Sequence, residues 1–445
     1  MRASRVASGV LVVVALGSQA ALAQDAAPNG LAGLLLRFFS PGNPVTLQDN
    51  PVPAFSHAAH FVSQPNAQAT LRQLNRGIAS QISTFPLGSS AASFTYTFDA
   101  ALGVYNRSTE SFGPVFAERA ITAGKGKFSF GVNYLDASYD RFEGQDLRQD
   151  DIQLYLTHQD PAHDGNLQPW FEGDIIRADL SLDLEQHTTA VFANYGITDR
   201  LDVGVAIPFQ HLRLDARIHT TIEHLATAPD PFTVHQFPGA GDSAEFRESG
   251  SASGIGDIVI RSKWNFHRGP STALAAALDL RLPTGNADDL LGSGATQAKL
   301  SLIASRSTGR FSPRASAGFT FSSGGADFLG DLPNEVNYTA GFDVALHRRV
   351  TFTADFLGRT LLDADRLVER ERVFQFDQRT DPTVRTATRL TPVSETGSLN
   401  LFLGSAGVKV NPVGRLLIVG NVLIAIGNEG LQDKVTPVIG LDYSF

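Results

Sequence analysis

The sequence has no cysteine and only one methionine. Without cysteine the chain can carry neither a disulfide nor a lipid attached to a thiol. After the N-terminus no apolar run approaches the roughly 20 residues of a membrane-spanning helix, so no helical span is expected. The formal net charge of −9 argues against nucleic acid as a partner. No catalytic signature, cofactor motif or zinc pair of the H-E-x-x-H type is present, so an enzyme is not expected and no cofactor is required. His57 and His60 have a spacing seen in metal sites, but no Cys or carboxylate lies directly beside them, so an ordinary polar loop is expected there.

The N-terminus has the pattern of an export signal. Arg2 and Arg5 precede a short apolar run at 10–16, and Ala21-Leu22-Ala23 supplies small residues for cleavage. These are the three parts of a secretory signal peptide, predicted at residues 1–23. The mature chain is therefore expected to leave the cytoplasm across the inner membrane.

The stretch from Gly254 to Asn286 predicts a long β-hairpin. In its first arm Ile258, Ile260, Trp264 and Phe266 fall on one face, with polar residues between them. The second arm repeats this alternation after a turn at 267–270, and period-two alternation is typical of strands. Each arm reaches the roughly 9–11 residues that a tilted strand needs to cross a bilayer. A soluble β-sandwich would also alternate, but arms of this length favour a membrane barrel.

The lengths of the connections strengthen the barrel prediction. Counting back from the C-terminus, short turns alternate with longer connections, the layout of an outer-membrane barrel. The longer connections include 141–176, 218–252 and 361–395. The pattern predicts a transmembrane antiparallel β-barrel of twelve strands starting at Lys127. Two less regular segments before Lys127 give an alternative of fourteen.

Aromatic residues mark the ends of several predicted strands. The last strand places Ile439, Leu441, Tyr443 and the terminal Phe445 on one face, as bacterial outer-membrane proteins do. That ending predicts recognition by the barrel-assembly machinery. The aromatic girdle and C-terminal signature are predicted at Tyr195, Trp264, Phe266, Tyr443 and Phe445.

The residues before the barrel differ in composition. A short apolar segment at 31–39 is followed by a Pro- and Asn-rich stretch, and residues 69–82 have helical spacing. Residues 24–110 are predicted to form a plug in the barrel mouth or a periplasmic segment, and residues 111–445 the barrel.

Charged residues on the predicted strands are expected to point inward, because charge is costly on the lipid-facing side. They are either interior ion pairs that support the wall or a lining that selects solutes. The predicted lumen-lining residues are Asp257, Arg261, Lys263, Asp279, Arg281, Arg314, Asp343, Asp355, Arg359 and Lys409. The acidic loop at 141–176 is interpreted first as a solvated loop; the alternative is that it binds divalent cations that bridge surface lipopolysaccharide.

Three motifs resemble a known family. The run at 254–264 (GIGDIVIRSKW), LRLPTG at 280–285 and LGSG at 291–294 look like the phenol-degradation meta-pathway family of outer-membrane channels, and the segment 195–208 is similar to the preceding hairpin of that family. The resemblance implies a barrel related to long-chain fatty-acid and aromatic-hydrocarbon channels. Those relatives have an N-terminal hatch, but no ligand-binding residue can be carried over.

The sequence therefore predicts a channel in the outer membrane of a Gram-negative bacterium that takes up small hydrophobic or aromatic compounds passively. Two alternatives remain open. One is an outer-membrane lipid hydrolase, which would need a serine and a histidine that meet at the outer leaflet. The other is a structural or adhesive barrel whose lumen is sealed.

Overall fold

The structure is a computed structural model. It describes residues 30–39, 45, 47–48, 65–89, 95–99, 104–158, 166–167, 173–226, 235–239, 241–328, 330–378 and 381–445. The predicted signal peptide and a His57–His60 pair lie outside the described residues. No helix in the described part of the chain is long and apolar enough to cross a membrane.

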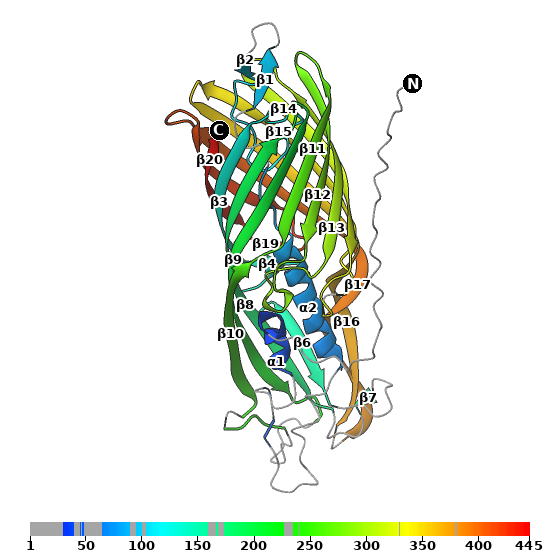
Figure 1. The fold of residues 1–445 in the computed structure, drawn as a ribbon. Coiled ribbons are helices and arrows are strands. Elements are labelled where there is room, and N and C mark those ends of the chain that lie inside the picture. The colour runs from blue at the N-terminus through cyan, green and yellow to red at the C-terminus, as the bar shows by residue number, and fades with distance from the viewer. Residues whose placement is uncertain are drawn as a thin grey trace, which may run out of the picture.

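Twelve antiparallel strands form a closed barrel (Figure 1). Its strands are β3 (Phe128–Tyr139), β8 (Ile175–Gly196), β9 (Leu201–Glu223), β11 (Ile258–Arg268), β12 (Thr272–Leu282), β13 (Thr296–Arg306), β14 (Phe311–Ser323), β15 (Glu335–His347), β16 (Val350–Gln378), β17 (Asp381–Val410), β18 (Leu416–Ile426) and β20 (Val435–Ser444). The barrel closes where β20 pairs with β3, from Val438↔Leu135 to Ser444↔Ser129. The prediction of a twelve-stranded barrel is confirmed.

The alternative of fourteen strands is wrong. The two segments before Lys127 contain β1 (Tyr96–Asp99) and β2 (Val104–Arg107), which pair only with each other. Each of these strands has four residues, too few to span a wall. The first wall strand begins at Phe128.

The two faces of the wall differ sharply in composition. Trp264 and Leu302 are 55% and 64% exposed on the outer face, whereas the inward Lys263 is only 1% exposed. This apolar outer surface is what a bilayer would cover. The predicted hairpin is confirmed as β11 and β12, with register pairs from Ile258↔Leu282 to Arg268↔Ala273.

The residues of the predicted aromatic girdle all lie on the outer face near the end of the barrel that carries the short turns. Tyr443 and Phe445 form an edge-to-face pair with ring centroids 4.8 Å apart. Trp264 and Phe266 lie 5.8 Å apart, and Tyr195 is 48% exposed beside the turn after β8.

Two of the predicted long loops are instead strands that continue beyond the barrel. Residues 218–252 include the end of β9 and β10 (Ser243–Ile255), and residues 361–395 belong to the β16–β17 hairpin. Charged residues occupy consecutive positions in this hairpin, as at 369–372, because strands outside a bilayer need no continuous apolar face. The apolar alternation that identifies a membrane strand is therefore absent there.

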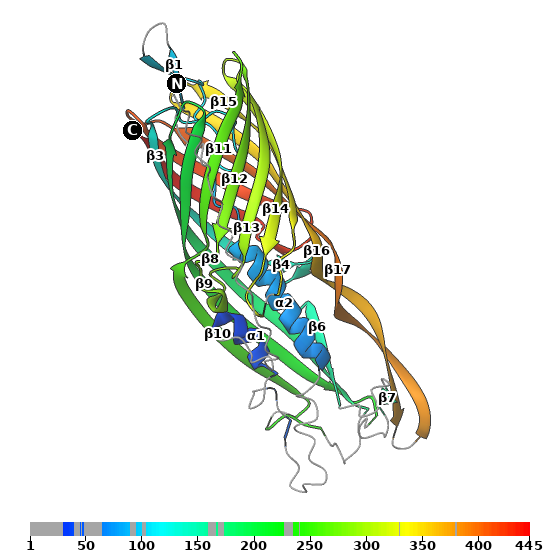
Figure 2. The ribbon, with the colours of Figure 1, turned by 45° about the vertical axis from the view of Figure 1, so that its right-hand side comes forward.

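Residues 141–176 also contain short strands. They are β4 (Arg141–Phe142), β5 (Gln145–Asp146), β6 (Ile152–Thr157) and β7 (Asn166–Leu167), and β4 pairs with β19 (Leu431–Gln432). β6 adds to β8, so β6, β8, β9 and β10 form a sheet that projects beyond the barrel (Figure 2).

Helices fill the mouth between this sheet and the β16–β17 hairpin. The helix predicted at 69–82 is confirmed as α2 (Pro65–Ser83), and the apolar segment forms η1 (Leu31–Gly33) and α1 (Leu34–Arg37). α2 contacts β6, β16 and β17. Its buried Leu71, Leu74, Ile78 and Ile82 join one apolar core with the projecting sheet. The helices lie at the end of the barrel opposite to the C-terminus (Figure 1).

Candidate functional site: the lumen

An irregular stretch of chain crosses the inside of the barrel. Residues 108–123, which we call the lumenal segment, contain no helix and no strand. Backbone groups enclosed in this way must find hydrogen-bond partners. Inward polar side chains of the wall supply many of these partners.

One half of the lumenal segment is held by β16 and β17. Lys409 Nζ donates to the carbonyl oxygen of Pro114 at 2.6 Å, and Thr351 Oγ1 accepts from the Phe112 amide at 3.1 Å. Asp355 accepts from the Ala117 amide at 3.4 Å. The Lys409 side chain is fully buried, and its ammonium group also lies 3.8 Å from Asp442 on β20.

The other half is held by β9, β11 and β13. Glu118 accepts from Arg261 at 2.7 Å and lies 3.4 Å from Lys263 Nζ. Ala120 donates its amide to Ser305 at 3.2 Å and accepts from the Asn265 amide at 3.0 Å. The lumenal segment therefore spans the lumen and is anchored on opposite walls.

Beside the segment lies a buried charge cluster, which contacts Ser111 and Ala117. Arg314 forms an ion pair with Asp343 at 2.7 Å and a second one with Asp355. All three side chains are at most 1% exposed. Two carboxylates share one guanidinium here, so removal of Arg314 would leave both without their cation.

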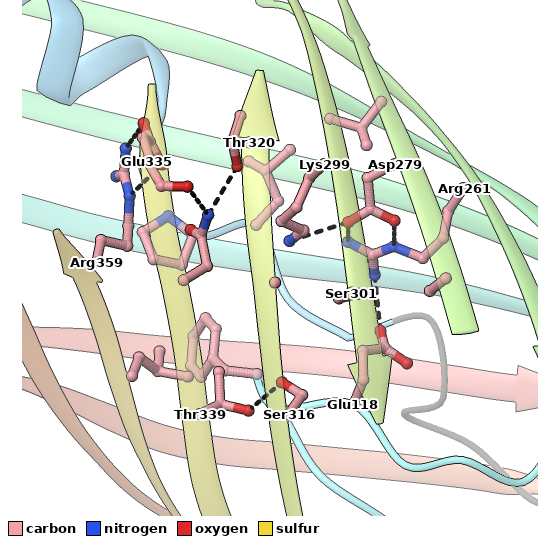
Figure 3. A pocket seen from close by; sticks show the side chains of 18 of the residues that line it. Glu118, Arg261, Asp279, Lys299, Ser301, Ser316, Thr320, Glu335, Thr339 and Arg359 are labelled. Carbon is pink, nitrogen blue, oxygen red and sulfur yellow. Dashed lines mark hydrogen bonds and ion pairs between the residues drawn. The ribbon is translucent and has the colours of Figure 1, made fainter. Parts of the chain in front are cut away.

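A cavity of about 190 Å³ lies beside the lumenal segment, between it and the wall from β11 to β16. Figure 3 shows Arg261 bridging Asp279 and Glu118, with Lys299 on the far side of Asp279. On the opposite side Arg359 pairs with Glu335 at 2.6 Å. The apolar part of the cavity lining includes Phe116, Val259, Ala277, Ile303 and Leu357. The cavity is therefore amphiphilic.

The predicted lumen-lining residues fall into three groups. Four of them line the cavity: Arg261, Asp279, Arg281 and Arg359. Five contact the lumenal segment or the buried cluster beside it: Lys263, Arg314, Asp343, Asp355 and Lys409. Asp257 lies apart, at the kink between β10 and β11.

Asp257 connects the three sequence motifs that resemble the phenol-degradation family. Its carboxylate accepts from the Gly285 amide at 3.1 Å and from the Ser293 amide and hydroxyl at 2.9 and 2.8 Å. A Cβ at Gly285 would lie 2.3 Å from the carbonyl oxygen of Leu291, so the chains approach too closely for a side chain. The motifs at 254–264, 280–285 and 291–294 thus form one joint at the rim of the barrel.

Several charged residues of the lumen were not predicted, among them Asp202 on β9, which accepts from the Ala123 amide. Lys299 and Asp442 alternate with exposed leucines on β13 and β20, so their inward direction was readable from the register. Glu335 is the first residue of β15, so no alternating pattern of apolar and polar residues precedes it to indicate its direction. Glu118 lies in the irregular lumenal segment, where no periodicity predicts a direction.

A row of polar side chains follows the apolar belt on the outer face. Asp136, His187, His211 and Ser253 are cross-strand neighbours on β3, β8, β9 and β10. Ser253 Oγ lies 2.7 Å from His211 Nδ1, and His187 Nδ1 lies 3.0 Å from Asp136. Phe209, two residues before His211, is still 45% exposed, so the row begins where the belt ends.

A second polar cluster lies at the far end of the projecting sheet. Asp174 Oδ2 lies 3.1 Å from His224 Nδ1 and 3.0 Å from His235 Nδ1, and His224 Nε2 lies 3.1 Å from Asp242. The hydrogen bond to Asp174 raises the pKa of His224 above its ordinary value, against the opposing effect of burial. Among the described residues, no group of His, Asp and Glu side chains is arranged to hold a metal ion.

The raised pKa predicts that this cluster loosens in base. Protonated His224 stabilises this cluster fully at pH values below the pKa of His224 in the unfolded chain, about 6.5. The stabilisation is lost as the pH rises through the higher pKa of His224 in the folded protein. We expect the Ala226 amide, which donates to Asp174, to exchange faster at about pH 9 than at about pH 5.5, after correction for intrinsic rates. In His224→Gln this difference should vanish; an unchanged difference would assign it to another group.

The comparisons with known proteins agree with the motifs. Residues 176–377 match the family model described as "Putative MetA-pathway of phenol degradation". The match confirms the resemblance stated from the sequence and contains the three motifs that meet at Asp257. A search of curated protein sequences finds no match.

Several solved structures are similar to this chain. An outer membrane channel from Pseudomonas putida F1 is 10% identical, with a TM-score of 0.43 over 73% of this chain and 98% of that chain. A Pseudomonas aeruginosa FadL homologue is 13% identical, with a TM-score of 0.30 over 72% and 89%. The toluene transporter of Ralstonia pickettii is 12% identical, with a TM-score of 0.27 over 72% and 90%.

Proposed function

We propose that the protein is an outer-membrane channel whose lumenal segment controls the passage of small solutes. The observation that carries the proposal is the lumenal segment itself, an irregular chain anchored by polar contacts beside an amphiphilic cavity. Such contacts can be exchanged for water or solute, whereas a packed apolar core cannot be opened without a large cost. The apolar outer belt supports placement in a membrane.

The solutes we propose are small compounds with a hydrophobic or aromatic body, taken up down their gradient. The apolar part of the cavity lining supports this class, and so does the phenol-degradation family match at 176–377. We further propose that residues 24–110 act with the lumenal segment as a hatch. The exposed aromatic ending of β20 supports recognition by the barrel-assembly machinery, and the projecting sheet would meet lipopolysaccharide.

The experiment that tests the channel is single-channel conductance in planar bilayers. It compares the full-length mature chain with two deletions, one ending before the lumenal segment and one that removes it. A channel requires current in at least one of these proteins. Silence in all three would instead favour the sealed structural barrel.

The Ser253–His211 pair favours a second candidate, a lipid hydrolase. The pair lies where the apolar belt ends, which is the level of the ester groups of a surrounding bilayer. A histidine that accepts the serine proton is the basis of a serine nucleophile. Among the described residues, however, no carboxylate contacts His211, which distinguishes this pair from a complete triad.

A fluorophosphonate probe tests this candidate. If the pair is active, the probe should label the wild type, and Ser253→Ala should abolish labelling. Ser251→Ala is the matched control, since Ser251 is exposed on the same face two residues along β10. Wild-type protein that takes no label would eliminate the hydrolase.

A further inference from the structure

We infer that the lumen cavity binds small organic anions in preference to neutral compounds or cations of the same size. This inference rests on the proposed channel and assigns its solute class. The hydrogen-bonding groups around the cavity differ in whether protein partners already occupy them.

The carboxylates of the cavity are fully engaged. Asp279 accepts two hydrogen bonds from Arg261, at 2.7 and 3.0 Å, and one contact from Lys299. Both carboxylate oxygens of Glu335 accept hydrogen bonds from Arg359, at 2.6 and 3.1 Å. Glu118 uses one oxygen for Arg261 and the other for Lys263. No carboxylate of the lining therefore has an oxygen without a cation.

The cations are not used up in the same way. Arg281 carries five N–H donors, and one of them bonds the carbonyl oxygen of Ser83 at 2.7 Å. Among the described residues Arg281 forms no ion pair. Lys299 has three donors, contacts Asp279 at 3.0 Å, and keeps 34% of its side chain exposed in the cavity. The available groups are thus cationic donors.

Asp257 is another inward carboxylate on this side of the barrel, and its oxygens accept from the amides of Gly285 and Ser293. Asp257 is absent from the cavity lining, and its three hydrogen bonds hold it in the joint at the rim. The lining itself contains four cations (Arg261, Arg281, Lys299, Arg359) against three carboxylates (Glu118, Asp279, Glu335). The cavity therefore keeps an excess of positive charge.

The hydroxyl groups of the wall do not change this balance. Ser316 and Thr339 bond each other at 2.7 Å, and Thr320 accepts from Asn337 at 2.7 Å (Figure 3). A solute that supplies acceptor atoms, as a carboxylate does, would complement Arg281 and Lys299. Its body would lie against the apolar lining. A cavity of about 190 Å³ has room for one ring, since an apolar cavity of roughly 150 Å³ in another protein binds benzene.

The experiment compares three probes of one size, namely benzoate, benzyl alcohol and benzylammonium. Calorimetry on the full-length mature protein in detergent measures binding, and liposomes measure flux. We expect benzoate to bind at least about tenfold more tightly than either other probe, the effect of one charge-assisted hydrogen bond. Arg281→Gln and Lys299→Gln should each reduce benzoate binding by a similar factor.

Arg247→Gln is the control, because it removes the same charge from the exposed outer face of β10. Equal binding of the three probes would overturn the inference, as would equal losses in Arg281→Gln and Arg247→Gln, or the absence of binding by any probe. Selective benzoate binding without flux of any probe would support the inference and contradict the proposed channel. Flux of all three probes without preferential binding of benzoate would support the proposed channel and contradict the inference.

Discussion

Removal of the lumenal segment should open the barrel, whereas removal of residues 24–90 alone should not. The shorter deletion takes away α1 and α2 but leaves residues 108–123 anchored on opposite walls. Deletion through residue 123 also removes the segment of chain that crosses the lumen. Barrels of eight strands are filled by their own side chains, whereas those of 16–18 strands enclose aqueous channels. Twelve strands without the segment should therefore pass water and ions, and conductance should rise on the order of tenfold.

Heat-modifiable mobility on gels is the control for folding, because a closed barrel migrates differently from an unfolded chain. A point variant provides an independent check in the intact protein. Asn265→Ala with Ser305→Ala removes both side-chain contacts to Ala120 and should make opening events more frequent. Full conductance after the shorter deletion would show that the helices, and not the lumenal segment, close the pore.

Arg314→Ala should be the most destabilising single substitution in the barrel. It leaves Asp343 and Asp355 buried without their cation, and breaking a buried ion pair from one side costs about 3–5 kcal/mol. The measurement is urea unfolding of the protein in lipid vesicles, followed by tryptophan fluorescence. Asp343→Asn combined with Asp355→Asn in the same background should recover part of the loss.

The matched control is Arg247→Ala, which breaks an ion pair whose side chains are 72% and 40% exposed. Exposed pairs of this kind contribute at most about 1 kcal/mol. Similar losses in Arg314→Ala and Arg247→Ala would mean that water reaches the buried cluster. The lumen around this cluster would then contain water in the closed state.

The wall was predictable because a bilayer imposes a strict pattern. Lipid on one side of the wall and a polar lumen on the other force apolar and polar residues to alternate. The adjacent residues Lys263 and Trp264 therefore indicate which side chain points inward and which points outward. Short turns such as 267–270 mark the strand ends. The strand count, the β11–β12 hairpin and the barrel class follow from this pattern.

What lies outside the bilayer or inside the lumen was not predictable in the same way. The β16–β17 hairpin continues beyond residue 361 with charges on both faces, so no apolar period identifies it. The lumenal segment has no repeating backbone conformation, and its position depends on side chains of the wall far away in sequence. Glu118 illustrates this, because its partners Arg261 and Lys263 come more than a hundred residues later.

The path of the N-terminal part has a consequence for the order of assembly. Helix α2 lies at one end of the barrel and the β1–β2 hairpin at the other, and the lumenal segment leads from there back across the lumen to β3. An α-helix with its side chains is about 10–12 Å wide, so threading it through a finished barrel would be slow. The closing pair, β3 with β20, joins the first and last wall strands. Because contacts so distant in sequence are expected to form late, we expect the wall to close around a lumenal segment that is already inside.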